Sequence, residues 1–301
     1  MALGLRAPFR ALSRHAFIRR ATTGADFRPT ETFQYASREE ERVIKTTLHE
    51  LGTQREDMKL SLKVYHFQEL SRTSIRDAIF ERDGRYVQLK KDLQEEVNKL
   101  SPAQLVAAMV SCGRLSVRDK QIWWDLARAV ERHTVKTRSG ASGLQHSQIC
   151  LTMHALGKAN IKIKDRFYYR MLKMMMKRAE IWTEFDMAWI LYGMRKRRLR
   201  PRNPEQKEHK LWARVLRAVA AYFRQKMHFI SPKGIVYILY EFAQHGIFPG
   251  EDLFRATRRI RRHLSSLSNR ALVLLAVLLA RFDWPEQRLL KKYSAEIRKS
   301  Y

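Results

Sequence analysis

Five stretches of the sequence share one apolar pattern, and this repetition limits the possible folds more than any other feature. The stretches are residues 100–115, 144–159, 182–197, 230–245 and 267–282. Apolar side chains recur five, nine and twelve residues after each start, which is the spacing of one helix face. In four stretches a glycine or alanine follows at the thirteenth position, where a small residue lets the chain turn or another helix approach. The pattern predicts five helices.

Each unit also contains a second predicted helix, which begins at a large apolar residue. These residues are Trp123, Phe167, Trp212, Phe254 and Leu290. Successive units start 37 to 48 residues apart, which is typical of two-helix repeats. The sequence therefore predicts an all-α fold, a right-handed solenoid of about five antiparallel helix pairs preceded by an N-terminal helical segment. A five-pair helical bundle with only generic amphipathicity is the alternative.

The predicted organisation has three parts: residues 1–25, 26–99 and 100–301. The first 25 residues contain five arginines and no acid, and Arg6, Arg10 and Arg14 share one helical face. This pattern predicts a mitochondrial transit peptide and a location in the mitochondrial matrix. A basic, disordered tail on a cytosolic protein is the alternative. Residues 26–99 are predicted to be an extension with helices that either cap the repeats or dock a partner.

The net charge of +29 is concentrated in the repeats. Residues 26–99 hold 14 Lys and Arg against 15 Asp and Glu, whereas residues 100–301 hold 40 against 15. Like charges at this density repel one another unless a polyanion neutralises them. Inside mitochondria the available polyanions are RNA, DNA and cardiolipin-rich membrane, and RNA binds through counterion release from its phosphates. We therefore expect an RNA partner, with ribosomal RNA as the first choice.

Three clusters of basic residues are the predicted phosphate contacts, because the guanidinium fork suits phosphate and can stack on an unpaired base. Their members are Arg195, Lys196, Arg197, Arg198, Arg200 and Arg202; Arg255, Arg258, Arg259, Arg261 and Arg262; and Lys173, Lys177 and Arg178. Nearby tyrosines either stack on bases or pack between helices: Tyr168, Tyr169, Tyr192, Tyr237 and Tyr240.

No catalytic motif is recognisable in the sequence. It lacks a glycine-rich phosphate loop, HExxH, GxSxG and a paired-cysteine metal site. We therefore expect a protein that is not an enzyme and has no cofactor, no metal and no small-molecule substrate. Cys112 and Cys150 are predicted to be reduced core residues. No apolar run reaches the ~20 residues of a membrane-spanning helix, so no transmembrane segment is predicted.

Residues 147–157 and 267–281 carry a resemblance to organellar helical-repeat RNA-binding proteins. Residues 100–301 resemble octotricopeptide-like repeats and the repeat region of FAST-kinase-like proteins, but without the C-terminal nuclease-like RAP module. The resemblance implies RNA binding without cleavage, as in accessory subunits of protist mitochondrial ribosomes or in assembly factors, with ribosomal proteins as neighbours. Two other functions stay open: a structural subunit of a respiratory complex or ATP synthase whose basic surface meets cardiolipin, and a helical nuclease.

Overall fold

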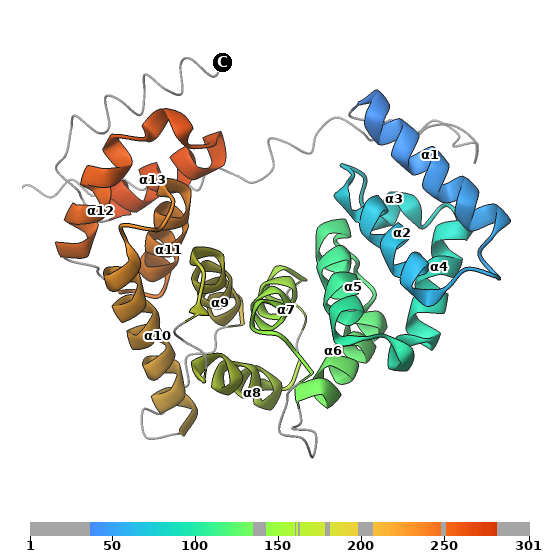
Figure 1. The fold of residues 1–301 in the computed structure, drawn as a ribbon, viewed down its shortest axis with the longest axis horizontal. Coiled ribbons are helices and arrows are strands. Elements are labelled where there is room, and N and C mark those ends of the chain that lie inside the picture. Colours follow the sequence, from blue (N-terminus) through green and yellow to red (C-terminus); the bar gives the residue numbers. More distant parts are fainter. Residues whose placement is uncertain are drawn as a thin grey trace, which may run out of the picture. The chain divides into compact units, whose positions relative to one another are not determined.

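The computed structural model describes residues 37–134, 143–159, 161, 163–177, 181–197, 207–247 and 251–281. The described residues form helices and no strands, which confirms the all-α class (Figure 1). The chain divides into two units, residues 1–33 and 34–301. The first unit contains the predicted transit peptide and lies outside the described residues, as does the predicted helix that begins at Leu290.

Residues 37–100 contain four helices and a short 3-10 turn: α1 (Arg38–Thr53), α2 (Leu60–Arg72), α3 (Asp77–Phe80), α4 (Gly84–Glu95) and Val97–Lys99. The Ser37 side chain caps α1 by accepting a hydrogen bond from the Glu40 backbone N–H. Helix α1 packs on α2 and α4, and α2 also packs on α5, the first helix of the repeats. Fully buried Phe67 and Phe80 stack on Tyr86 at the centre of this region.

The five helices predicted from the apolar pattern are present, and each begins two residues after the predicted start. They are α5 (Pro102–Leu115), α7 (His146–Ala159), α9 (Glu184–Lys196), α11 (Pro232–Gln244) and α13 (Asn269–Arg281), here called the first helices. The shift has a local cause in three of them, because Ser101, Thr183 and Ser231 are N-caps whose side chains bind the first turn.

Successive first helices pack against one another in chain order, α5 on α7, α7 on α9, α9 on α11 and α11 on α13 (Figure 1). The contact between α7 and α9 is very close. A Cβ atom on Gly193 would lie 2.7 Å from the Met153 carbonyl oxygen, and one on Gly157 would lie 3.1 Å from the Gly193 Cα. Only glycine allows the two backbones to approach this far.

Four of the predicted second helices are present among the described residues, and they lie beside the first helices: α6 (Lys120–Thr134), α8 (Asp165–Met176), α10 (Lys207–Lys226) and α12 (Glu251–Arg261). Helix α6 packs on α5 and α8, α8 packs also on α7 and α10, and α12 packs on α11. Of the large apolar residues at which the second helices were predicted to begin, Trp123, Phe167 and Trp212 are buried. Phe254 is 56% exposed, and Ala256 and Ile260 form the buried face of α12 instead.

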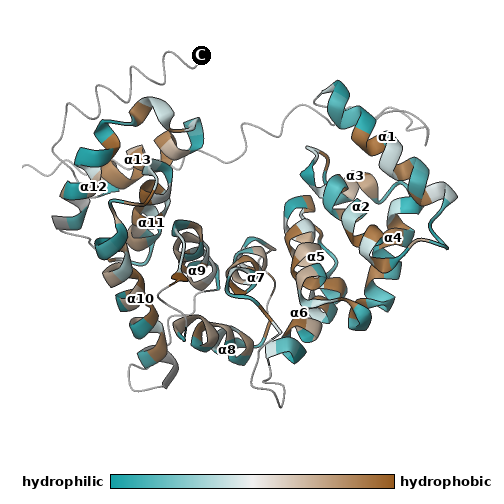
Figure 2. Ribbon diagram, in the orientation of Figure 1, coloured by the Kyte–Doolittle hydropathy of each residue, from teal (hydrophilic) through white to brown (hydrophobic). Residues whose placement is uncertain are grey.

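Hydrophobic and hydrophilic residues alternate along the helices, as a layer of amphipathic helices requires (Figure 2). Nearly all residues five, nine and twelve positions after the starts of the five stretches are buried; Ala276 is the exception. Within the part of the chain that the structure describes, no helix combines the length and the apolarity needed to cross a membrane.

Candidate nucleic-acid interface

Basic and aromatic side chains gather on the side of the first helices that faces away from the apolar stripe. This side carries the residues three, seven, ten and fourteen positions after each start, since 3.6 residues make one turn. None of these twenty residues is buried and none is acidic. Twelve of them are basic or aromatic: Arg114, His154, Lys158, Phe185, Trp189, Tyr192, Lys196, Lys233, Tyr237, Tyr240, Arg270 and Arg281. We call this surface the first-helix face.

The aromatic members of the first-helix face form a patch that crosses from α7 to α9. The His154 ring lies 5.0 Å from the Tyr192 ring and 5.9 Å from the Trp189 ring, measured between centroids. Trp189 in turn lies 5.8 Å from Phe185, which is 44% exposed. Half-buried rings of this kind are held in place by their neighbours and still offer a π-surface on which an unpaired base can stack.

Cations lie over several of these rings. The Arg195 guanidinium is 5.2 Å from the Tyr192 ring centre and 6.0 Å from that of Tyr240. The Lys196 amine is 5.7 Å from the Tyr192 ring, and the Arg270 guanidinium is 6.0 Å from the Tyr237 ring. Cation–π contacts of this length hold the positive charge beside the stacking surface.

Positive charges from four separate segments act on one another at the first-helix face. Burial of its amine lowers the pKa of Lys158, and the charges of Arg76, Arg114 and Arg270 lower it further. The Arg76 guanidinium also donates a 2.9 Å hydrogen bond to the Arg114 carbonyl oxygen. Burial together with Lys158, Arg270 and Arg114 lowers the pKa of His154 to about 4, so its ring is neutral at pH 7. A phosphate would relieve this mutual repulsion.

A second basic site, the arginine pocket, lies where the end of α10 meets α12. Its volume is about 460 Å³, and Arg255, Arg258, Arg259 and Arg262 line it at the spacing of one helix face. Its single lining carboxylate, Asp252, lies 2.9 Å from Arg224. Arg259 donates a hydrogen bond to the His228 carbonyl oxygen, which fixes that guanidinium at the wall.

Two members of the first predicted cluster are engaged within the protein. The Arg195 guanidinium donates two hydrogen bonds to Glu241, at 2.7 and 2.8 Å, and joins α9 to the buried side of α11. Arg197 donates to the Ile163 carbonyl oxygen, lies 4.8 Å from the Tyr168 ring centre and keeps only 10% of its side chain exposed. These two arginines therefore contribute first to the packing of α9.

The other predicted residues occupy several surfaces. Lys196 is exposed on the first-helix face, Lys173 and Lys177 are exposed on and after α8, and Arg261 is half-buried. The residues Arg178, Arg198, Arg200 and Arg202 lie outside the described residues. Tyr168 is fully buried between helices, whereas Tyr169, Tyr192, Tyr237 and Tyr240 are only half-buried. Packing therefore accounts for Tyr168.

The cations missed by the sequence reasoning are Arg114, Lys158 and Arg270, because none of them stands in a run of basic residues. For two of these cations, the repeat columns of the sequence contain a signal. The fourteenth position of the five stretches reads Arg114, Lys158, Lys196, Gln244 and Arg281. This column contains Arg114 and Lys158, whereas Arg270 stands three residues after the start of its stretch, in a column whose only other basic residue is Lys233.

A scan against models of known protein families found no match to this chain, and neither did a search of the curated proteins.

Proposed function

We propose that this protein is a non-catalytic RNA-binding scaffold of mitochondrial gene expression, either a subunit or an assembly factor of the mitochondrial ribosome. The observation that carries the proposal is the composition of the first-helix face, where twelve of twenty residues are basic or aromatic and none is acidic. A surface of this kind binds a polyanion that also offers flat rings. Single-stranded RNA and the loops of ribosomal RNA meet both requirements.

The proposed architecture is a right-handed solenoid of about five antiparallel helix pairs. The chain-order packing of the first helices supports it, and so does the contact of α6 with α8 and of α8 with α10. In such a fold the first helices present one continuous surface, to which each repeat adds one row of side chains. The first-helix face is that surface.

In the proposed mode of binding, phosphates and bases are recognised by different members of the first-helix face. Arg114, Lys158 and Arg270 neutralise phosphates, and the affinity comes from the release of counterions. Trp189 and Tyr192 stack on unpaired bases whatever their identity. The pair between Arg195 and Glu241 supports the rings by fixing α9 against α11. Recognition of this kind reads shape and phosphate spacing rather than a base sequence.

The proposed location, the mitochondrial matrix, rests on the arginine-rich, acid-free composition of residues 1–25. A second candidate function is that of a structural subunit of an inner-membrane complex, and the arginine pocket favours it. Five arginines around a cavity of about 460 Å³ suit the phosphates of a cardiolipin headgroup as well as those of RNA.

The decisive experiment measures RNA affinity of the full-length protein by fluorescence anisotropy with a labelled single-stranded RNA. The double variant Arg114→Glu, Lys158→Glu should bind at least about tenfold more weakly than the wild type, because four units of charge change at the site. A matched control, Lys91→Glu, changes an exposed lysine that pairs with Glu95 in the N-terminal helices. Equal affinity of all three proteins would overturn the proposal.

A second arm distinguishes the two candidate functions. Tagged protein from mitochondria is sedimented through a gradient with and without RNase, and the purified protein is floated with cardiolipin vesicles. RNase-sensitive sedimentation with ribosomal particles supports the scaffold. Flotation that depends on Arg258 and Arg262, with sedimentation unaffected by RNase, supports the membrane-complex subunit instead.

A further inference from the structure

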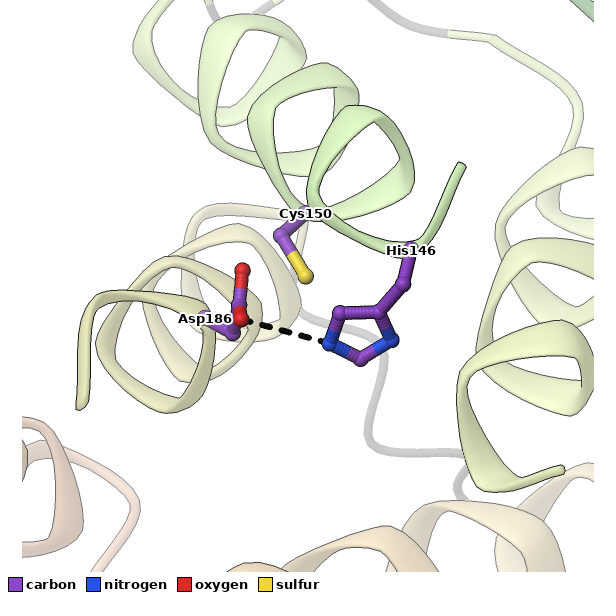
Figure 3. A group of neighbouring side chains, drawn as sticks. All are labelled: His146, Cys150 and Asp186. Atoms are coloured by element: carbon purple, nitrogen blue, oxygen red, sulfur yellow. Dashed lines mark ion pairs between the residues drawn. The ribbon is translucent and has the colours of Figure 1, made fainter. Parts of the chain in front are cut away.

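Three metal-ligating side chains meet in the interior between α7 and α9: His146, Cys150 and Asp186 (Figure 3). His146 and Cys150 are four residues apart at the start of α7 and so project from the same helix face. Asp186 comes from the first turn of α9. One ligand atom of each residue lies within 4.8 Å of the other two, and all three residues are buried.

His146 is the most informative member of this group. Its side chain is 8% exposed, and its Nδ1 atom has no hydrogen-bond partner among the described residues. The Nε2 atom faces Asp186, with 3.2 Å between Nε2 and the nearer carboxylate oxygen (Figure 3). A buried imidazole with an unpartnered nitrogen is costly, and such a group in a native interior calls for an explanation such as an ion.

Asp186 is held in place by its own helix. One carboxylate oxygen accepts hydrogen bonds from the backbone N–H and the hydroxyl of Thr183, at 2.9 and 2.8 Å. Burial acts to raise the pKa of Asp186, but the contact with His146 and the donors of Thr183 lower it to about 2. The carboxylate is therefore ionised and pre-oriented, as carboxylate ligands of metal sites are by their hydrogen-bonding neighbours.

Cys150 completes the set with a sulfur ligand. Its side chain is fully buried, and its Sγ lies 3.5 Å from the Sδ of Met175. Burial, the charge of Asp186 and a hydrogen bond to Asp186 raise the pKa of the thiol, so the metal-free cysteine is protonated. A divalent cation replaces that proton, which passes to solvent, and the two resulting anionic ligands balance its charge. The loaded site is electrically neutral, as a buried site requires.

We propose that His146, Cys150 and Asp186 bind one Zn²⁺ ion that joins α7 to α9. Imidazole nitrogen, thiolate sulfur and carboxylate oxygen are the three ligand types that zinc accepts together, whereas Mg²⁺ and Ca²⁺ take oxygen ligands. A structural zinc site is closed by four protein ligands, and the Met175 thioether, 3.5 Å from the Cys150 sulfur, is the side chain placed to supply the fourth. The ion is structural, because it fixes the two helices that carry His154, Trp189 and Tyr192. The inference does not depend on RNA binding.

The test uses full-length protein purified without chelators. Metal analysis should find one zinc per chain, and Co²⁺ added after chelation should give the thiolate-to-cobalt charge-transfer band. Zinc at about a hundred times its Kd should raise Tm by roughly 5–10 °C. Cys150→Ala should lose the metal, the band and the Tm shift. Cys112→Ala is the matched control, because Cys112 is equally buried and free but belongs to no such cluster among the described residues.

Asp186→Asn keeps the test valid if Cys150→Ala does not fold. The amide preserves the size of the side chain and an oxygen that can cap α9, but removes the anionic ligand. Folding is checked by circular dichroism, and metal content should fall in this variant too. Folded wild type that takes up no more zinc than Asp186→Asn and gives no cobalt band would overturn the proposal. Equal metal loss in Cys112→Ala would overturn it as well.

Discussion

Two lysines show how differently charge is used in the N-terminal helices and in the repeats. Lys90, on α4, lies 2.9 Å from both Asp77 and Glu81; burial opposes its charge, but these carboxylates raise its pKa. Lys158, on α7, meets Arg76, Arg114 and Arg270, and its pKa is lowered. Lys90 is a structural group, because its counter-ions Asp77 and Glu81 belong to the same set of helices. Lys158 is a partly desolvated charge, and the three guanidinium groups around it disfavour its charged form.

The same contrast extends to the two regions. In the N-terminal helices Lys63 and Arg55 both reach Asp92, at 2.8 and 3.1 Å, so these cations serve the fold. Among the described residues of the repeats, most lysines and arginines are exposed, with exceptions such as Arg195, which pairs with Glu241. A cation count therefore does not locate a binding surface. The partners of each cation do.

The largest expected effect is the loss of stability on removing Asp77, which is 2% exposed and also accepts a 2.7 Å hydrogen bond from Tyr86. Asp77→Ala leaves the Lys90 ammonium and the Tyr86 hydroxyl without their common partner. The free energy of unfolding should fall by about 3–5 kcal/mol, measured by urea denaturation. Glu81→Gln removes the half-exposed partner of the same lysine and should cost about 1 kcal/mol or less. Equal losses would contradict the structural role of the buried pair.

The second largest effect is a loss of stability at acidic pH that depends on His154. Because burial and its basic neighbours depress the pKa of His154 from 6.5 to about 4, the unfolded state binds the proton first. Stability from this neutral histidine is complete above pH 6.5 and is lost as the pH falls towards 4. The loss amounts to up to about 3 kcal/mol. Urea unfolding at pH 7 and pH 4.5 should show a smaller pH dependence in His154→Gln than in the wild type. An unchanged pH dependence would contradict the depressed pKa.

Two glycine substitutions test how closely helix backbones approach one another in the two regions. Gly193→Ala forces a methyl group to within 2.7 Å of the Met153 carbonyl oxygen, so α7 and α9 must separate. We expect a loss of about 1–3 kcal/mol in thermal or urea unfolding. Gly84→Ala is the control from the N-terminal helices, where a Cβ would meet no atom within 4 Å. It should be neutral or slightly stabilising, because alanine favours helix. Similar losses of stability in the two variants would show that the close approach of α7 and α9 does not constrain the packing of the first helices.

The sequence allowed the prediction of the first helices to within two residues, because the apolar stripe has to face the second helices wherever the repeat occurs. The first-helix face was not predicted, although its residues stand in repeat columns. Arg114, Lys158 and Arg270 are isolated in the sequence and come together only when α5, α7 and α13 are folded into one layer. Conversely, Arg195 and Arg197 stand in a basic run, but the fold brings acids to both from far along the chain. Pairing across the fold is a tertiary property.

The cysteine and histidine of the proposed zinc site show the same limit. His146 and Cys150 are four residues apart, but their carboxylate partner stands 36 residues further on in another repeat. No local motif connects the three. Only the packing of α7 on α9, which the glycines permit, brings Asp186 to the pair.

The smallest effect separates a binding charge from a structural one. Lys158→Ala removes one cation from a group of like charges, so the free energy of unfolding should rise, by up to about 0.5 kcal/mol. Its affinity for single-stranded RNA should fall, and the slope of log affinity against log salt should decrease by about 0.7, the value for one phosphate contact. Lys91→Ala, in the N-terminal helices, should leave affinity and slope unchanged. A lysine held for stability would give the opposite result at position 158, with stability lost and RNA affinity kept.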